Sequence, residues 1–180
     1  GVCQPSTTAF RAALNAGLPV TQRFEHAYRV HYYEEAGPGY EHGKPGMDAT
    51  VYAPSKDLRF LNDTGHHILI QTHYDPVSYR LTFDIYGTSD GRQVEITEPV
   101  VYNVTSPPAP IYFDRPDKPV GWIEQVDWAA GGAEVRFEYR VQYPDGEINE
   151  QVFHSNYRAW SAKYERGTME EGGEEATTEV

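Results

Sequence analysis

The chain contains a single cysteine, Cys3, in a short turn that leads directly into a predicted helix. Phe10, Ala13 and Leu14 recur at helical spacing, and Gly17 is the type of residue that ends a helix. A thiol at a helix N-terminus lies at the positive end of the helix dipole, which favours the nucleophilic thiolate. One interpretation is therefore nucleophilic chemistry at Cys3. The other is a small buried apolar residue, the common role of a lone cysteine.

The element that must position this thiol is a helix predicted over residues 6–16, with Ser6 or Thr7 as its N-cap. The rest of the sequence favours strands, because apolar and polar residues alternate in several segments, among them residues 79–85 and 135–141. The expected fold is mainly β (α+β). We expect the helix to pack on a β-meander over residues 49–96, and an extended all-β module to follow.

Composition excludes several classes of function. The formal net charge of −12 and a sequence pI near 4.9 argue against nucleic acid as a partner and against contact with an anionic membrane. One cysteine allows neither an intramolecular disulfide nor a multi-cysteine metal site. His66 and His67 are adjacent and should point to opposite faces of a strand, and His73 is distant from both. Neither a metal nor a cofactor is expected.

The first half of the chain resembles the VanW family, proteins of the cell envelope named after an accessory gene of vancomycin-resistance clusters. The resemblance begins with GVCQPSTT at residues 1–8 and continues through GLPV at 17–20 and an Arg23-x-x-His26 pair. It ends with DATV at 48–51, DLRFLNDT at 57–64 and ILI at 68–70. A run of ordered motifs like this one is specific.

This resemblance implies a domain over residues 1–91 that is the C-terminal part of a VanW domain, truncated at its start. It also implies a place on the extracellular side of a bacterial envelope, with a membrane anchor in a missing N-terminal part. Some VanW-domain proteins are cysteine-dependent L,D-transpeptidases, which join peptidoglycan stem peptides. The resemblance thus favours catalysis by Cys3.

The candidate partners of Cys3 follow from these motifs. His26 is the preferred base because it lies in the Arg23-x-x-His26 motif; the alternative is a structural histidine. Asp48 could orient the imidazole, or it could be a turn residue that bonds its own backbone. Arg23 could bind a substrate carboxylate, or it could be a solvated strand charge.

Backbone amides near the thiol are the remaining candidates for substrate binding. Those of Gln4, Ser6 and Thr7 could bind a developing oxyanion, whereas Pro5 has no N–H to contribute.

The second half resembles the G-five domain, a small extended β module, over residues 92–167. The residues that carry this resemblance are Gly121, Gly131, Gly132, Gly146 and Tyr164-x-x-Gly167-Thr168. It implies binding of peptidoglycan glycan chains, for which Trp122, Trp128 and Trp160 could form an aromatic platform; the alternative is that these rings form the core. Residues 168–180 are acidic and almost free of apolar side chains, so we expect a disordered tail.

Two hypotheses from different classes remain. The first is an enzyme that transfers acyl groups between stem peptides through a thioester on Cys3. The second is a non-catalytic envelope protein, associated with glycopeptide resistance, that binds peptidoglycan and its glycan chains. Thiol reactivity separates them, because only the first requires rapid alkylation of Cys3 near neutral pH.

Overall fold

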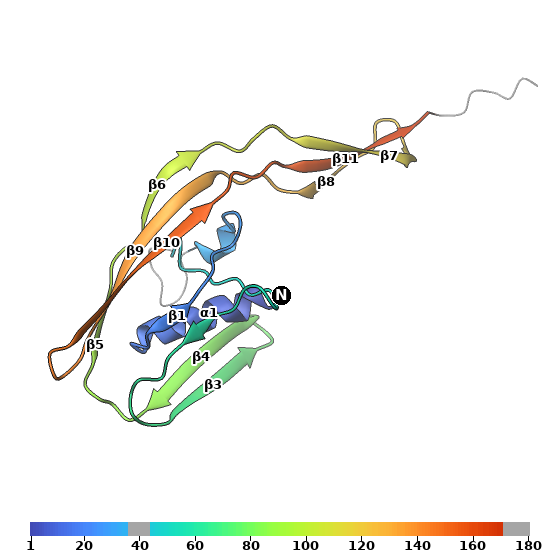
Figure 1. Cartoon of the computed structure of the whole chain (residues 1–180). Helices are drawn as coiled ribbons and strands as arrows, with labels where there is room; N and C mark the ends of the chain where they lie inside the picture. Colours follow the sequence, from blue (N-terminus) through green and yellow to red (C-terminus); the bar gives the residue numbers. More distant parts are fainter. Residues whose placement is uncertain (36–43, 171–180) are drawn as a thin grey trace, which may run out of the picture.

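A computed structural model describes residues 1–35 and 44–170 of the chain (Figure 1). These residues form one α-helix, α1 (Cys3–Asn15), one 3₁₀ helix, η1 (His31–Tyr33), and eleven strands. The strands are β1 (Val20–Gln22), β2 (Arg59–Phe60), β3 (Ile68–Asp75), β4 (Arg80–Gly87), β5 (Gln93–Ile96), β6 (Val100–Thr105), β7 (Ile111–Pro119), β8 (Ile123–Asp127), β9 (Gly132–Gln142), β10 (Ile148–Tyr157) and β11 (Lys163–Met169). The predicted class, mainly β with one N-terminal helix, is confirmed.

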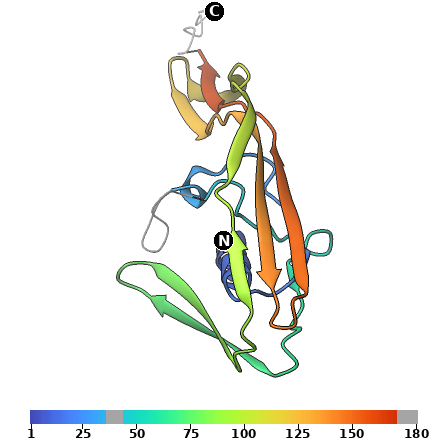
Figure 2. The same cartoon turned by 90° about the vertical axis from the view of Figure 1, so that its left-hand side faces the viewer.

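A curved sheet forms the centre of the molecule, and α1 lies on its concave side (Figures 1 and 2). Strand β9 pairs antiparallel with β10 along its whole length, and with β5 and then β6 along its other edge. The β3–β4 hairpin lies on the other side of the helix, where β4 contacts α1. The helix is therefore covered from two sides.

The core joins the two halves of the sequence. Strand β9 alternates strictly, so that Val135, Phe137, Tyr139 and Val141 are all buried on one face of the sheet. These side chains belong to the same apolar cluster as Phe10 of α1, which is fully buried. The two predicted domains, residues 1–91 and 92–167, therefore share one apolar cluster. The segment 1–91 offers one helix and two small sheets, and residues beyond position 91 supply the large apolar face.

The helix starts earlier than predicted and ends where predicted. Its N-cap is Val2, which makes no side-chain cap bond, and Cys3 is the first helical residue. Ser6 and Thr7, the predicted caps, are buried inside the helix. Gly17 follows the C-cap with a φ of 73°, and Leu18 N–H bonds to the Ala13 carbonyl, which is the glycine-terminated end that the sequence predicts.

The predicted β-meander over residues 49–96 is wrong, because only the β3–β4 hairpin pairs locally. Strand β2 pairs with β1, and β5 pairs with β9, a strand some forty residues later. Alternation identified the strands but carries no information about which partner each one takes.

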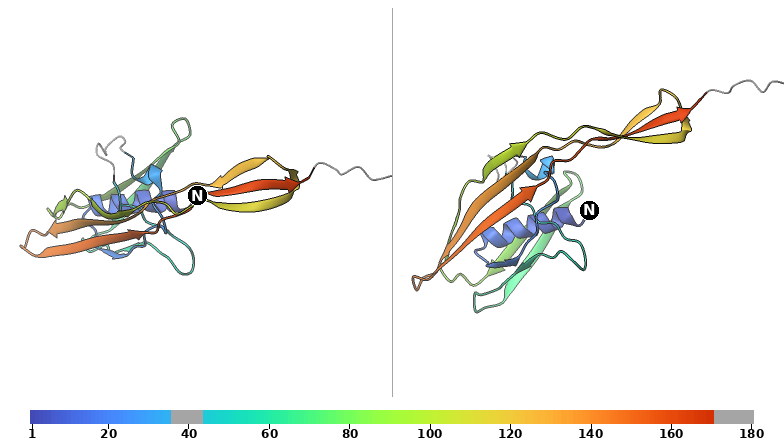
Figure 3. Two further views of the ribbon diagram at one scale, coloured as in Figure 1. Left: turned by 90° about the horizontal axis from the view of Figure 1, so that it is seen from above. Right: turned by 45° about the horizontal axis from the view of Figure 1, so that its top comes forward.

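The last part of the chain is a thin three-stranded sheet in the order β7–β11–β8, which extends away from the curved sheet (Figure 3). Strands β7 and β11 run parallel. A Cβ placed on Gly167 would lie 1.9 Å from the Pro119 carbonyl oxygen, so this position requires glycine. Residues 168 and 169 of the predicted tail belong to β11, and the rest of that tail, from 171 on, lies outside the described residues.

Candidate active site

Helical spacing places Cys3 on the buried face of α1. It shares this face with Thr7, Phe10 and Leu14, which follow at intervals of three and four residues. The Cys3 Sγ lies 3.3 Å from Thr50 Oγ1 and 3.7 Å from the Val51 carbonyl oxygen. The thiol is thus at the N-terminal end of the helix, facing the segment that carries the DATV motif, and it is partly accessible.

Asp48 begins that motif and holds His26. Its Oδ2 lies 2.5 Å from His26 Nδ1 and accepts a further bond of 2.9 Å from the His26 backbone N–H. Because the carboxylate accepts, Nδ1 carries the proton, and Nε2 is the nitrogen with a lone pair in the neutral ring. The structure therefore brings His26 and Asp48 into contact, and His26 lies close enough to Cys3 for each to shift the pKa of the other. The spacing of these residues in the sequence did not show this.

Arg23 was predicted as a possible ligand of a substrate carboxylate. The structure places it inside the protein instead. Its side chain is 3% exposed, and its Nη2 donates to Asp48 Oδ1 at 3.0 Å. The remaining N–H groups donate to the carbonyls of Asp48, Gly46 and His154 and to the Ser155 hydroxyl. Arg23 therefore fixes Asp48 and ties its loop to β10.

Tyr157 completes the surroundings of Asp48. Its hydroxyl donates to Asp48 Oδ1, and the ring is buried at the end of β10. Sequence reasoning missed this residue, because no pattern links positions 109 residues apart. Tyr33 was missed too: its ring stacks on His26 with centroids 4.9 Å apart and limits the rotation of the imidazole.

The charges of the site favour a thiolate next to an imidazolium. Burial alone would raise the pKa of Asp48, but the bonds from His26 and the Arg23 charge outweigh it and hold that pKa at about 2. Burial alone would lower the pKa of His26, yet Asp48 and the thiol of Cys3 raise it. Partial burial opposes ionisation of Cys3, but hydrogen bonds with Thr50 and the Val51 backbone and the proximity of His26 lower its pKa.

Two of the predicted substrate-binding positions, Ser6 and Thr7, have other surroundings than predicted. The Thr7 hydroxyl is buried and exchanges hydrogen bonds with the Ala49 backbone, so it supports the DATV segment instead of binding substrate. Ser6 is also buried, and its N–H bonds to the Val2 carbonyl. Only the N–H of Gln4 keeps the predicted position, in the first turn, where helix amides have no intrahelical partner.

The three tryptophans do not form one platform. Trp122 precedes β8 and Trp128 follows it, so the length of the strand separates them. Trp160 stacks on Tyr28 and donates its Nε1–H to Asp127. Trp128 is 70% exposed. The prediction of a shared aromatic surface is therefore wrong for Trp122.

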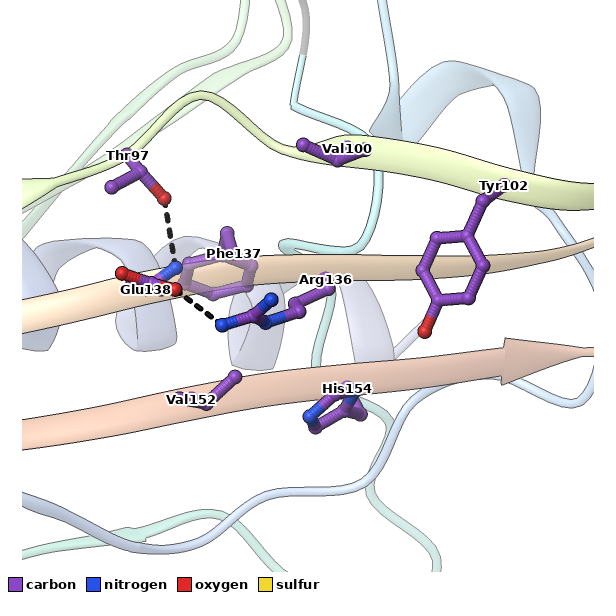
Figure 4. Close-up of a pocket in the computed structure, with 8 residues that line it drawn as sticks. All are labelled: Thr97, Val100, Tyr102, Arg136, Phe137, Glu138, Val152 and His154. Carbon is purple, nitrogen blue, oxygen red and sulfur yellow. Dashed lines mark hydrogen bonds and ion pairs between the residues drawn. The ribbon is translucent and has the colours of Figure 1, made fainter.

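A hollow of about 480 Å³ lies instead on the face of the curved sheet that points away from α1 (Figure 4). Arg136 and Glu138 of β9 form an ion pair there, and the Glu138 N–H donates to Thr97 Oγ1 at 2.8 Å. The Tyr102 side chain, from β6, also lines the hollow, together with Val100, Val152 and His154. None of the predicted tryptophans lines it.

Within residues 1–35 and 44–170, no group of three or more His, Cys, Asp and Glu side chains is placed to hold a metal ion. His73 faces Asp84 at 3.5 Å, across the β3–β4 pair. In the same described part of the chain, α1 is too short and too polar to cross a membrane.

Comparison with known proteins confirms the VanW resemblance. Residues 1–86 match the model of the family described as "VanW like protein". Over 71 residues the chain is 39% identical to the uncharacterized protein YoaR of Bacillus subtilis (strain 168). The matched segment covers 39% of this chain and 20% of that protein. The chain thus spans about a fifth of the length of this relative.

A solved structure of the IgA1 protease G5 domain is also similar to part of the chain. The match covers 46% of this chain and 99% of that one, at 15% identity and a TM-score of 0.28.

Proposed function

We propose that this chain, whose residues 1–86 are VanW-like, is part of a bacterial cell-envelope protein that transfers acyl groups between peptidoglycan stem peptides through Cys3. The observation that carries the proposal is the convergence of a thiol, an imidazole and a buried carboxylate at the N-terminus of α1. Cysteine acyl-transfer sites use this set of groups, in which a third residue orients the base. The VanW match supports the envelope as the place of action, on its extracellular side.

The reaction follows from the charges of the three groups. The Cys3 thiolate attacks the carbonyl carbon of the penultimate residue of the donor stem, and the N–H of Gln4 is placed to bind the oxyanion. The imidazolium of His26 protonates the leaving amine, so that the terminal D-amino acid departs and a thioester remains. Neutral His26 then takes a proton from the acceptor amine as that amine attacks the thioester. A new amide forms, and thiolate and imidazolium are restored.

Muropeptides with tetrapeptide stems test this proposal. Intact-protein mass spectrometry should detect an acyl adduct on the wild-type chain and cross-linked dimers among the products, with neither present for Cys3→Ala. Cys3→Ser is the matched control for shape, because its hydroxyl is not ionised near neutral pH and is a much poorer nucleophile than a thiolate. If Cys3→Ala makes cross-links as well as the wild type does, Cys3 is not the nucleophile.

A second candidate function is non-catalytic binding of peptidoglycan. The hollow on the outer face of the curved sheet favours it, because a tyrosine ring, a guanidinium and two valines offer stacking and polar contacts to a sugar chain. Titration with soluble glycan fragments tests this function. It would be favoured over catalysis by chemical-shift changes confined to β6, β9 and β10, together with slow alkylation of Cys3.

A further inference from the structure

An open hollow of about 540 Å³ lies at the N-terminal end of α1, and two neighbours of Cys3 line it. Val2, the residue before Cys3, forms one wall, and Val51, whose carbonyl contacts the Cys3 Sγ, forms another. The rest of the lining comes from residues 52–54, 56 and 57. A molecule in this hollow would therefore contact residues that adjoin the nucleophile of the proposed reaction.

The hollow contains one cation, Lys56. Paired backbone bonds between Tyr52 and Lys56, both 2.9 Å, close the loop that carries it. The Lys56 ammonium lies 5.8 Å from the centre of the Phe24 ring, and among the described residues it forms no ion pair. Asp57, the carboxylate in the lining, is engaged by Arg59 Nε at 3.0 Å and by the Leu58 N–H. In a chain with a net charge of −12, an ammonium with no ion pair in the described part of the chain, in a hollow lined by two neighbours of the reactive thiol, is an unusual feature.

We propose that this hollow binds the carboxylate-bearing end of the acyl donor, and that Lys56 is the residue that recognises the carboxylate. The proposal rests on the proposed function, since it assigns the donor side of the same site. In the reaction given above, the group that leaves is a terminal amino acid with a free carboxylate. An ammonium in the hollow attracts that charge, while Val2 and Tyr52 offer apolar surface to its side chain. Lys56 thus selects donors with a free C-terminus.

Alkylation of Cys3 by a charged and an uncharged reagent tests the role of Lys56 without any stem peptide. Iodoacetate carries a carboxylate and iodoacetamide does not, so the ratio of their rates at Cys3 reports the local charge. Lys56→Gln should lower the ratio by up to about fivefold, the limit set by a unit charge in contact with the reagent at about 4 Å in water, and 1 M NaCl should reduce the difference. Lys56→Arg should retain the wild-type ratio.

Lys118→Gln is the matched control. Lys118 is also a half-buried lysine that lies over an aromatic ring, 5.4 Å from the centre of Trp122, but it belongs to the far end of the thin sheet. This substitution makes the same change in net charge and should leave the ratio unchanged. Equal ratios for Lys56→Gln and wild type, or equal effects of Lys56→Gln and Lys118→Gln, would overturn the proposal.

A second measurement separates this inference from the proposed function. The Cys3→Ala variant cannot react, and it is titrated with a tetrapeptide that ends in a free D-amino acid carboxylate and with the C-terminal amide of the same peptide. Shifts of amides 52–57 with the acid only, absent in the Cys3→Ala, Lys56→Gln double variant, support carboxylate recognition even if the wild type forms no thioester. Equal binding of acid and amide contradicts it, whatever the wild type catalyses.

Discussion

Asp48 is the residue on which the site depends. Its carboxylate accepts bonds from the ring and backbone of His26, from Arg23 and from Tyr157, so its position is fixed from three sides. The same arrangement makes it a structural residue, because Arg23 is almost fully buried and without Asp48 keeps only the more distant carboxylate of Glu25, at 4.0 Å. Catalytic positioning and stability therefore rest on one side chain.

Stability should depend on the ionisation of Asp48. Its folded pKa of about 2 is below the ordinary value of 3.8, so the carboxylate contributes stability above pH 4 that is lost as the pH falls towards 2. The contribution is about 2 kcal/mol. Asp48→Asn should be less stable by about 3 kcal/mol at pH 7, since it removes the nearer of the two carboxylates that pair with the buried Arg23. Urea unfolding at several pH values should show this difference shrinking below pH 4; a constant difference would contradict the assignment.

At the scale of single residues, the sequence predicted part of the site. The motifs identified Cys3, His26 and Asp48, and the structure places them together. They did not predict that Arg23 faces inward, because a solvated and a buried arginine look alike in sequence. Tyr157 and Lys56 were missed for a physical reason: each acts through a contact made by chain folding, not by spacing.

At the scale of elements, α1 presents the thiol and supports the segment opposite it. Thr7 Oγ1 accepts from the Ala49 N–H at 3.1 Å and also contacts the Ala49 carbonyl oxygen, next to Asp48. Arg11 donates to the Met47 and Tyr33 carbonyls, at 2.8 and 2.6 Å. The helix thus fixes the backbone on both sides of Asp48 and the residue that stacks on His26.

Thr7→Val should therefore destabilise the protein by about 1–3 kcal/mol, because it leaves the buried Ala49 N–H without its partner. Thr8→Val is the matched control: Thr8 Oγ1 bonds only a carbonyl of its own helix, that of Gln4, near the surface. The control should change stability by less than about 0.5 kcal/mol. Thermal unfolding of both variants measures this, and equal losses would show that the Ala49 contact is unimportant.

The elements themselves were easier to predict than their pairing. Alternation located β4 and β9, and Gly17 located the end of α1. The start of α1 was predicted three residues late, since Ser6 and Thr7 are favourable caps by composition but are used for packing. The earlier start places Pro5 in the first turn of α1. Proline is tolerated there, because an N–H at that position would have no partner within the helix.

At the scale of the whole molecule, the VanW-like part is completed by strands that follow it. Phe10 and Leu14 pack in one cluster with Phe137, Tyr139 and Val141, and Tyr139 donates its hydroxyl to the Leu18 carbonyl. Arg92 links the Gly17 carbonyl to Asp63 and Asp90. Residues 1–91 thus lack the inner face of β9 and β10 that covers their helix.

A fragment of residues 1–91 should not fold alone. Its amide spectrum should show poor dispersion and its unfolding should not be cooperative, because Phe10 and Leu14 would lose the apolar surface that buries them. The chain 1–170 is the control and should unfold in one transition. A well-dispersed spectrum for 1–91 would show that the two predicted domains are independent after all.

The central claim is that His26 and Asp48 activate Cys3, and the pH dependence of its alkylation tests this most directly. An ordinary thiol shows its inflection near pH 8.5, and the rate of Cys3 with iodoacetamide should rise at a lower pH than that, because its pKa is lowered. His26→Gln removes the imidazolium, so its inflection should move up towards the ordinary value. His31→Gln is the control, since His31 is exposed and also pairs with a carboxylate, that of Glu35. If His26→Gln and the wild type have the same profile, His26 does not act on Cys3, and the proposed reaction is contradicted.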